Sequence, residues 1–322
     1  MNMISVSRLT KTYGDLTAVD DISFQVEKGE IYGFLGPNGA GKTSTINMMI
    51  GLSRPSAGEI EVAGIDVRRR TKKAQAGMGI VPDESNLYNE MDGFDNLCFC
   101  ASLYGMRREE REAKARRLLT LFRLDDAGRR PFKAYSRGMR RRLTIAAALI
   151  HSPQVLFLDE PTTGIDVESS RQIRDLIVEL KQQGTTIFLT THYIEEAERI
   201  CDRIAFIAGG RIVAAGSLPE LMDSVSRQHA IRFITAGNST VHAAELESRF
   251  AGSEVRAQAD RTIVMTSRQR IPLFPVMEFL HNRGVEVLEA RELRPSLEDV
   301  FVRLTGIDTS VPAKPGQKEA DQ

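Results

Sequence analysis

The residues best suited to do chemistry in this chain read GPNGAGKT, from Gly36 to Thr43. They fit the pattern G-x-x-x-x-G-K-[ST], in which successive backbone N–H groups turn inward around a phosphate. The lysine of this pattern is a mobile charge for the β- and γ-phosphates, and the hydroxyl after it can ligate Mg²⁺. The stretch predicts a nucleoside triphosphate site made of Gly36, Pro37, Asn38, Gly39, Ala40, Gly41, Lys42, Thr43 and Ser44.

The segments on either side of this loop support the prediction. An apolar run at 31–35 is typical of a buried strand, and residues 44–50 are typical of the first turns of a helix. The N-terminus of such a helix adds its dipole to the anion site. A chance match in an unrelated loop is the alternative, and the strand–loop–helix order argues against it.

Two adjacent acids, Asp159 and Glu160, follow an apolar run at 155–158. Parallel sheets present ligands beyond the C-terminal ends of their strands. There Asp159 can hold Mg²⁺ directly or through water, and Glu160 can orient or deprotonate an attacking water. An exposed acidic turn is the alternative, disfavoured by the four apolar residues before the pair.

His192 and Tyr13 are two further candidates. His192 follows a predicted strand and the pair Thr190–Thr191, which places an imidazole at the sheet edge within reach of the γ-phosphate. Tyr13 offers an aromatic face to adenine, a contact worth about 1–3 kcal/mol. Taken alone, either residue is more often structural.

The chain alternates strands and helices up to about residue 226, which predicts a mostly parallel sheet covered on both faces, with an antiparallel β portion. A mainly helical insert at 84–150 predicts a subdomain beside that sheet. The pattern then changes to strand–helix–strand–strand–helix–strand, the ferredoxin-like order. We therefore expect an α/β P-loop NTPase core at 1–226, a small α+β domain at 227–306 and a disordered tail at 307–322.

Composition argues against several classes of protein, namely nucleic-acid-binding proteins, proteins that hold a metal through cysteines, secreted proteins and membrane-spanning proteins. The 322 residues contain 43 Lys+Arg and 43 Asp+Glu, so no global field attracts nucleic acid, and we expect no nucleic-acid partner. The three cysteines lack metal-ligand spacing, which suits a reducing cytosol. No apolar run approaches the roughly 20 residues of a membrane span, and residues 1–20 are too polar for a signal peptide.

Together these motifs resemble those of the nucleotide-binding subunits of ABC transporters, over residues 3 to about 222. GPNGAGKT is similar to their Walker A and VLFLDE to their Walker B. YSRGM, at 135–139, resembles the LSGGQ signature and keeps Ser136 and Gly138. TTGID resembles the D-loop and ends on Asp166, while His192 matches the switch histidine and Tyr13 the adenine-stacking aromatic. RPSLEDVFVRLTG, at 294–306, resembles the tail of daunorubicin-resistance-like ATPases of the ABC-2 type exporter branch.

The resemblance implies an ATPase that uses ATP and Mg²⁺ and works as a head-to-tail dimer. Each of its two sites would combine Walker A and B of one chain with Ser136 and Gly138 of the other. It also implies separate integral-membrane permease subunits, a peripheral place at the cytoplasmic face of the membrane, and a role in export. The transported substrate would be chosen by the permease.

This chain departs from the family pattern at two positions. Arg137 stands where the signature has its first glycine, and Asp83 stands at the Q-loop glutamine. Asp83 is still an oxygen ligand for Mg²⁺, so we expect it, with Thr43 and Asp159, to form the metal site. The alternative is that Asp83 points to solvent.

Two other functions remain open from the sequence. One is a soluble ABC-type ATPase acting in assembly or remodelling, disfavoured because the chain has neither a tandem nucleotide domain nor a long coiled-coil insert. The other is a P-loop kinase, which does not account for Ser136, Gly138 and His192.

Overall fold

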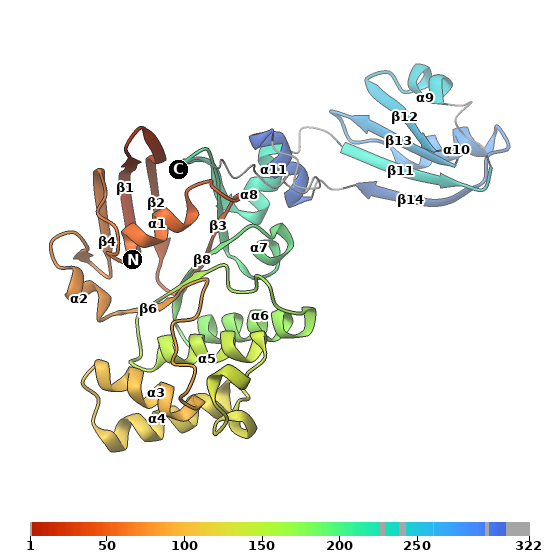
Figure 1. Cartoon of the computed structure of the whole chain (residues 1–322). Helices are drawn as coiled ribbons and strands as arrows, with labels where there is room; N and C mark the ends of the chain where they lie inside the picture. The colour runs from red at the N-terminus through yellow and green to blue at the C-terminus, as the bar shows by residue number, and fades with distance from the viewer. Residues whose placement is uncertain (1, 226–228, 238–242, 260, 294–295, 307–322) are drawn as a thin grey trace, which may run out of the picture. The chain divides into compact units, whose positions relative to one another are not determined.

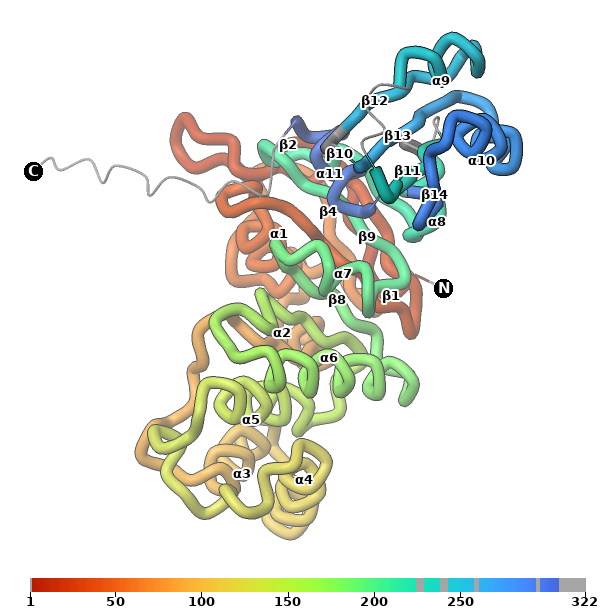
Figure 2. The backbone as a smooth tube through the Cα atoms, turned by 90° about the vertical axis from the view of Figure 1, so that its right-hand side faces the viewer, coloured from red at the N-terminus to blue at the C-terminus, as the bar shows by residue number. Residues whose placement is uncertain are grey.

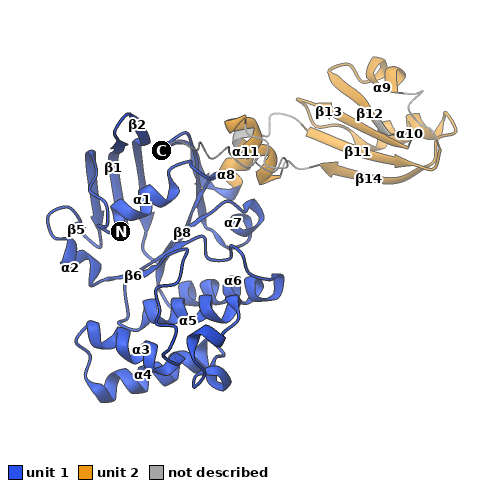
Figure 3. Ribbon diagram, viewed as in Figure 1, with its two compact units in different colours: residues 1–218 blue, residues 219–322 orange. Residues whose placement is uncertain are grey.

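The structure, a computed structural model, describes residues 2–225, 229–237, 243–259, 261–293 and 296–306. The chain divides into two compact units, residues 1–218 and 219–322 (Figure 3). This division precedes the boundary predicted after 226, which itself lies outside the described residues, as does the predicted tail at 307–322.

A six-stranded sheet forms the centre of unit 1, in the order β10-β9-β3-β8-β7-β6. Its strands are β3 (Ile31–Leu35), β6 (Met78–Val81), β7 (Val155–Asp159), β8 (Thr186–Thr191), β9 (Arg203–Ala208) and β10 (Arg211–Ser217). All neighbours are parallel except β9 and β10. Every residue of β3, β7 and β8 is buried, as the apolar runs predicted for strands covered on both faces.

A second, antiparallel sheet has the order β2-β1-β4-β5. It contains β1 (Asn2–Tyr13), β2 (Leu16–Glu27), β4 (Ala57–Val62) and β5 (Ile65–Asp66), and α1 (Lys42–Met49) shares its apolar core with the central sheet. Phe24 of β2 illustrates this shared core, because its ring stacks on Tyr32 and Phe188 of the central sheet, with centroids 5.6 and 5.8 Å apart. The shared core holds α1 and the loop before it between the two sheets.

The remaining helices of unit 1 gather on the other side of the central sheet. They are α3 (Gly93–Leu103), α4 (Arg108–Leu121), the short 3₁₀ turns η1 (Asp125–Ala127) and η2 (Phe132–Ala134), α5 (Arg137–Leu149), α6 (Val167–Gln182) and α7 (Ile194–Ile200). Figures 1 and 2 both show α3, α4 and α5 together at one end of the unit, with α6 beside α5. The short α2 (Thr71–Gln75) lies before β6. No described helix is long and apolar enough to cross a bilayer.

Unit 2 contains a four-stranded antiparallel sheet in the order β12-β13-β11-β14. Its elements are α8 (Leu218–Val225), β11 (His229–Thr235), α9 (Ala243–Arg249), β12 (Ser253–Ala259), β13 (Thr262–Ser267), α10 (Leu273–His281), β14 (Val287–Leu293) and α11 (Leu297–Thr305). The βαββαβ succession from β11 to β14 is the ferredoxin-like order predicted. The predicted fold class is therefore confirmed.

Candidate nucleotide-binding and hydrolysis site

Three buried strands bring the predicted site residues to one edge of the central sheet. Leu35 at the end of β3 pairs with Thr191 of β8, and Asp159 at the end of β7 pairs with Thr190. Because these strands are parallel, the chain leaves all three at the same edge. The phosphate loop, Glu160 and His192 therefore start side by side.

A cleft of about 450 Å³ opens at this edge. It is lined by Tyr13, Leu16, Ala18, Asn38, Gly39, Gly41, Lys42, Thr43, Ser44, Asp83, Glu160, Thr163 and His192. Gly36, Pro37, Ala40 and Asp159 were also predicted for the site but are not part of this lining. The volume is in the range of small-ligand sites.

The glycines of the phosphate loop are required by close backbone approaches. A Cβ on Gly36 would lie 2.2 Å from the carbonyl oxygen of Ile207, and one on Gly41 would lie 2.5 Å from that of Ala18. Gly41 also has a φ of 106° and is the N-cap residue of α1. A side chain at either position would push the loop away from the strands that support it, so the N-terminus of α1 can face the cleft only with glycine there.

Lys42, Glu160 and His192 form one connected group on the wall of the cleft. The Lys42 ammonium donates to the carbonyls of Gly36 (2.7 Å) and Pro37 (3.2 Å) and lies 3.2 Å from Oε1 of Glu160. Nδ1 of His192 lies 2.8 Å from Oε2 of Glu160. Burial raises the pKa of Glu160, but the His192 hydrogen bond and the Lys42 charge outweigh it, so the pKa falls below its ordinary value. Glu160 is therefore an ionised carboxylate at neutral pH.

The backbone of Glu160 has a φ of 48°, in the left-handed region. Its N–H donates to the carbonyl (3.1 Å) and the hydroxyl (3.2 Å) of Thr190, and its carboxylate accepts from the Thr163 hydroxyl at 3.0 Å. A non-glycine residue in this region costs on the order of 1–3 kcal/mol and persists where its surroundings hold it. These contacts hold the strained backbone, and the carboxylate of Glu160 lines the cleft.

Asp159, Thr43 and Asp83 are the residues predicted to hold a metal ion. Burial and the nearby carboxylates of Glu160 and Asp83 raise the pKa of Asp159, whereas hydrogen bonds from the Thr190 and Thr43 hydroxyls lower it. A divalent cation would relieve this repulsion. Among the described residues, no cluster of three or more His, Cys, Asp or Glu forms an all-protein cage. Mg²⁺ needs no such cage, because it takes one or two carboxylates together with substrate phosphates, so these residues fit it.

Tyr13 forms part of the cleft wall with its side chain 48% exposed. Hydrogen bonds with Ser53 and Ser44 lower the pKa of its hydroxyl, so the ring is fixed next to the phosphate loop. Lys11 lies over the ring, with its ammonium 4.7 Å from the centroid. The exposed aromatic face is placed where a base attached to a loop-bound triphosphate could stack.

The three remaining predicted residues, Ser136, Gly138 and Asp166, do not line this cleft. Ser136 caps α5 by accepting from the N–H of Met139 (3.2 Å), and Asp166 caps α6 by accepting from that of Ser169 (2.9 Å). Gly138 allows the two helices to approach, because a Cβ there would lie 2.2 Å from the Ser169 hydroxyl. The two capped helix starts lie together, apart from their own chain's phosphate loop.

A neighbouring cleft of about 570 Å³ separates this pair of helix starts from the loop after β6. It is lined by Asp83, Thr163, Arg137, Arg140 and Arg141, among others. Asp83 and Thr163 also line the first cleft, so the two clefts adjoin.

Several residues in contact with the site were not predicted. Thr190 holds both Asp159 and Glu160, and the buried Glu196 accepts from the hydroxyls of Thr162 and Thr191 at 2.8 Å each. Arg141 contacts the backbone on both sides of Glu160. Thr190 could have been found from its place before His192, whereas Arg141 is hidden in a run of three arginines.

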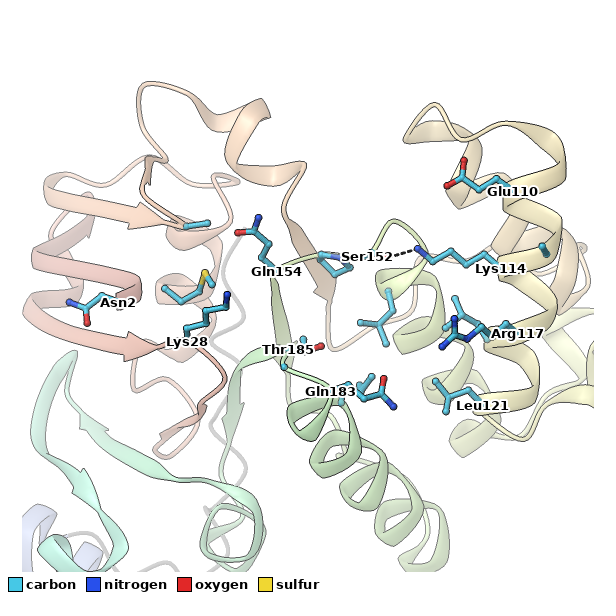
Figure 4. A pocket seen from close by; sticks show the side chains of 18 residues that line it. Asn2, Lys28, Glu110, Lys114, Arg117, Leu121, Ser152, Gln154, Gln183 and Thr185 are labelled. Carbon is cyan, nitrogen blue, oxygen red and sulfur yellow. Dashed lines mark hydrogen bonds between the residues drawn. The ribbon is translucent and has the colours of Figure 1, made fainter.

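A larger cavity, of about 890 Å³, lies where β7 and β8 begin, at the opposite end of these strands (Figure 4). Asn2, Lys28, Lys114, Gln154 and Thr185 are among its lining residues, and Lys114 donates to the Ser152 hydroxyl. None of the predicted site residues lines this cavity, so its size does not indicate the site of the chemistry.

Comparison with known proteins identifies the family. The ABC transporter family profile matches residues 19–163. The chain is 38% identical to the daunorubicin resistance ATP-binding protein DrrA3 of Streptomyces coeruleorubidus, over 96% of this chain and 97% of that protein. It is 39% identical to the Nod factor export ATP-binding protein I of Rhizobium etli, over 95% and 94%.

A solved structure gives the same answer for the fold. A dimeric ATP-binding cassette in a post-hydrolysis state, bound to ADP and Pi, superposes with a TM-score of 0.62 at 25% identity, over 67% of this chain and 99% of that one. The predicted resemblance is confirmed by all three comparisons. The chain belongs to the ATP-binding proteins of ABC transporters, in the ABC-2 type exporter branch, and is an ATPase.

Proposed function

We propose that this protein hydrolyses ATP in the 450 Å³ cleft, with Glu160 as the general base and Mg²⁺ as the metal ion. The observation that carries the proposal is the convergence of Lys42, Glu160 and His192 on one cleft wall beside the phosphate loop. The loop N–H groups and Lys42 bind the phosphates, and Tyr13 receives the base.

Glu160 has the properties that a general base needs. Its lowered pKa keeps it ionised at neutral pH, and its contacts with His192 and Thr163 fix the direction of the carboxylate. A positioned base of this kind contributes typically about 10²–10⁴-fold to a rate. His192 orients Glu160 and lines the same cleft, where it would lie near the end of a triphosphate bound to the loop.

Thr43, Asp159 and Asp83 would hold the metal ion. The chemistry that Mg²⁺ would supply there is neutralisation of the negative charge that develops on the phosphates. Thr43 supplies its hydroxyl and Asp159 its carboxylate, which Thr190 holds in place through a 2.5 Å hydrogen bond. Asp83 also lines the cleft, at the start of the loop that leads from β6 to the helical subdomain.

The signature residues act, in our proposal, on the ATP of a second copy of the chain in a head-to-tail dimer. Ser136, Gly138 and Asp166 lie outside their own chain's cleft, at the starts of two packed helices, where N–H groups and helix dipoles attract a phosphate. The solved relative described above is dimeric. Two copies therefore complete two sites.

The dimer would power export through separate integral-membrane permease subunits at the cytoplasmic face of the membrane. Support comes from the family and from two relatives whose names state drug resistance and Nod factor export. The small domain at 227–306 holds no nucleotide motif, and we assign it a regulatory or dimer-forming role.

Phosphate release by the purified full chain tests the hydrolysis proposal. The wild type should release phosphate from ATP and Mg²⁺ without an added acceptor. Glu160→Gln should lower this rate by roughly 10²–10⁴-fold while ATP still binds. Near-normal turnover of the variant would remove Glu160 from the mechanism.

Co-purification of a multi-span membrane protein tests the transport role, and a consistently partner-free ATPase would favour the remodelling alternative.

A further inference from the structure

Three consecutive arginines on α5 contact three different parts of unit 1. Arg140 donates to the carbonyl of Lys133 at 2.5 Å, and Arg142 donates to that of Phe122 at 3.0 Å. Both acceptors belong to the helical subdomain that contains α5 itself. Arg141 turns toward the central sheet instead and is only 8% exposed.

The Arg141 guanidinium donates to four main-chain carbonyls at the edge of the nucleotide site. Nε donates to Pro161 (3.0 Å), Nη1 to Pro82 and to Asp83 (3.1 Å), and Nη2 to Asp159. The guanidinium is planar and holds its donors in a fixed fork, so it sets the distances between the carbonyls that it binds. A lysine ammonium is a single point charge at the end of a flexible side chain, so it cannot donate to all four of these carbonyls.

Two of these carbonyls flank Glu160, which has the left-handed backbone described above. Arg141 therefore forms hydrogen bonds with the main chain immediately before and after Glu160. The other two carbonyls belong to the loop after β6, which carries Asp83. One side chain of the signature helix thus connects the two loops that follow the neighbouring strands β6 and β7.

The electrostatic surroundings keep this contact in place. Burial lowers the pKa of Arg141, and the carboxylates of Asp83, Asp159, Glu196 and Glu160 oppose that shift. Arginine remains charged in proteins, so a full positive charge stays behind the carboxylates of the site. The cation has no other role in the hydrolysis proposed above.

We propose that Arg141 is a positioning residue that holds the backbone of Glu160 in its strained conformation and ties it to the Asp83 loop. Movement of α5 is thereby transmitted to the carboxylate that acts on water. This inference rests on the proposed role of Glu160 as general base. Arg141, which lies outside both the phosphate loop and the signature, would thus affect the turnover rate.

The test compares Arg141→Lys with Arg142→Lys in the full-length protein. Arg141→Lys keeps the charge and loses the fork, so kcat should fall about 10- to 100-fold, the effect of a misplacement on the order of 1 Å, with KM for ATP nearly unchanged. Arg142→Lys makes the same chemical change one residue further along and should keep kcat. Equal losses in the two variants, or a loss of ATP affinity in place of kcat, would overturn the proposal. Thermal unfolding verifies that each variant is folded.

A double-mutant cycle with Glu160→Gln separates this inference from the function on which it rests. If Arg141 acts through Glu160, adding Arg141→Lys to Glu160→Gln should leave the residual rate within about 2-fold, because groups that act as a unit are not additive. If the double variant loses a further 10- to 100-fold in rate relative to Glu160→Gln, the inference about Arg141 is wrong and the proposed function still stands. Normal turnover of Glu160→Gln by itself overturns the proposed function, and the inference with it. Should Arg141→Lys not fold, Arg141→Gln takes its place, with the same two outcomes.

Discussion

Nδ1 of His192 lies 2.8 Å from Oε2 of Glu160, although the two residues follow different strands of the central sheet. The other carboxylate oxygen of Glu160 lies 3.2 Å from the Lys42 ammonium, which belongs to the helix after a third strand. Glu160 is thus held from both sides, and its pKa is set by residues far away in the sequence.

Replacing His192 with Ala should lower kcat and move the acid limb of the pH–rate profile to higher pH. The hydrogen bond from His192 lowers the pKa of Glu160, so its loss lets burial raise that pKa. Glu160 then protonates, and loses its activity as a base, at a higher pH than in the wild type. The measurement is kcat from about pH 3.5 to 8, because the lowered pKa of wild-type Glu160 puts its acid limb below the ordinary glutamate value of about 4.3. His281→Ala, an exposed histidine of unit 2, is the control, and an unmoved acid limb in His192→Ala would contradict the prediction.

Glu160→Gln should accumulate as a dimer in the presence of ATP. If two copies close on two ATP molecules and open after hydrolysis, a variant that binds without hydrolysing stays closed. Size-exclusion chromatography with and without ATP measures this, with ADP as the control ligand. A variant that stays monomeric with saturating ATP would count against the head-to-tail dimer.

Lys42→Ala should weaken nucleotide binding. The Lys42 side chain is only 6% exposed and its ammonium donates to the phosphate loop, so its removal takes away the mobile charge for the phosphates. ATP at 100 times its Kd stabilises a protein by about 2.7 kcal/mol, and the variant should lose most of this gain in thermal unfolding. Lys28→Ala, in the cavity at the opposite end of the strands, is the matched control and should keep the gain. An equal gain in wild type and Lys42→Ala is the result that would exclude this role.

Asp83→Gln should make ATP binding depend less steeply on Mg²⁺. A carboxylate facing a triphosphate repels it unless a cation lies between them, and Coulomb energies of a few kcal/mol (~4 at 4 Å with an effective dielectric constant of 20) are reasonable there. Asp83 lines the nucleotide cleft, whereas its neighbour Glu84 lines only the adjoining one. ATP affinity with and without Mg²⁺ should therefore change in Asp83→Gln and stay constant in Glu84→Gln. If Asp83→Gln has the Mg²⁺ dependence of the wild type, Asp83 faces solvent.

A chain that ends at residue 226 should still bind ATP. Every residue that lines the nucleotide cleft belongs to unit 1, which has its own apolar cores. Stabilisation by ATP in thermal unfolding compares the shortened chain with the full chain. A shortened chain that folds without binding ATP would show that the small domain has a part in the site.

The sequence by itself determined the phosphate loop, the Asp159–Glu160 pair and the order of strands and helices. These features are local: the loop depends on glycine spacing, and the buried strands on continuous apolar runs that have no other stable place. The βαββαβ order of the small domain was readable for the same reason, because each element carries its own periodicity.

Only the tertiary structure decided how the site residues meet. The register of β3, β7 and β8 brings His192 to Glu160, and no sequence pattern sets that register. The role of Arg141 was equally hidden, because three adjacent arginines on a helix point about 100° apart and only packing selects which one faces the sheet. Side-chain directions and pKa values depend on neighbours distant in the chain, so they follow from the assembled sheet and not from any stretch of residues.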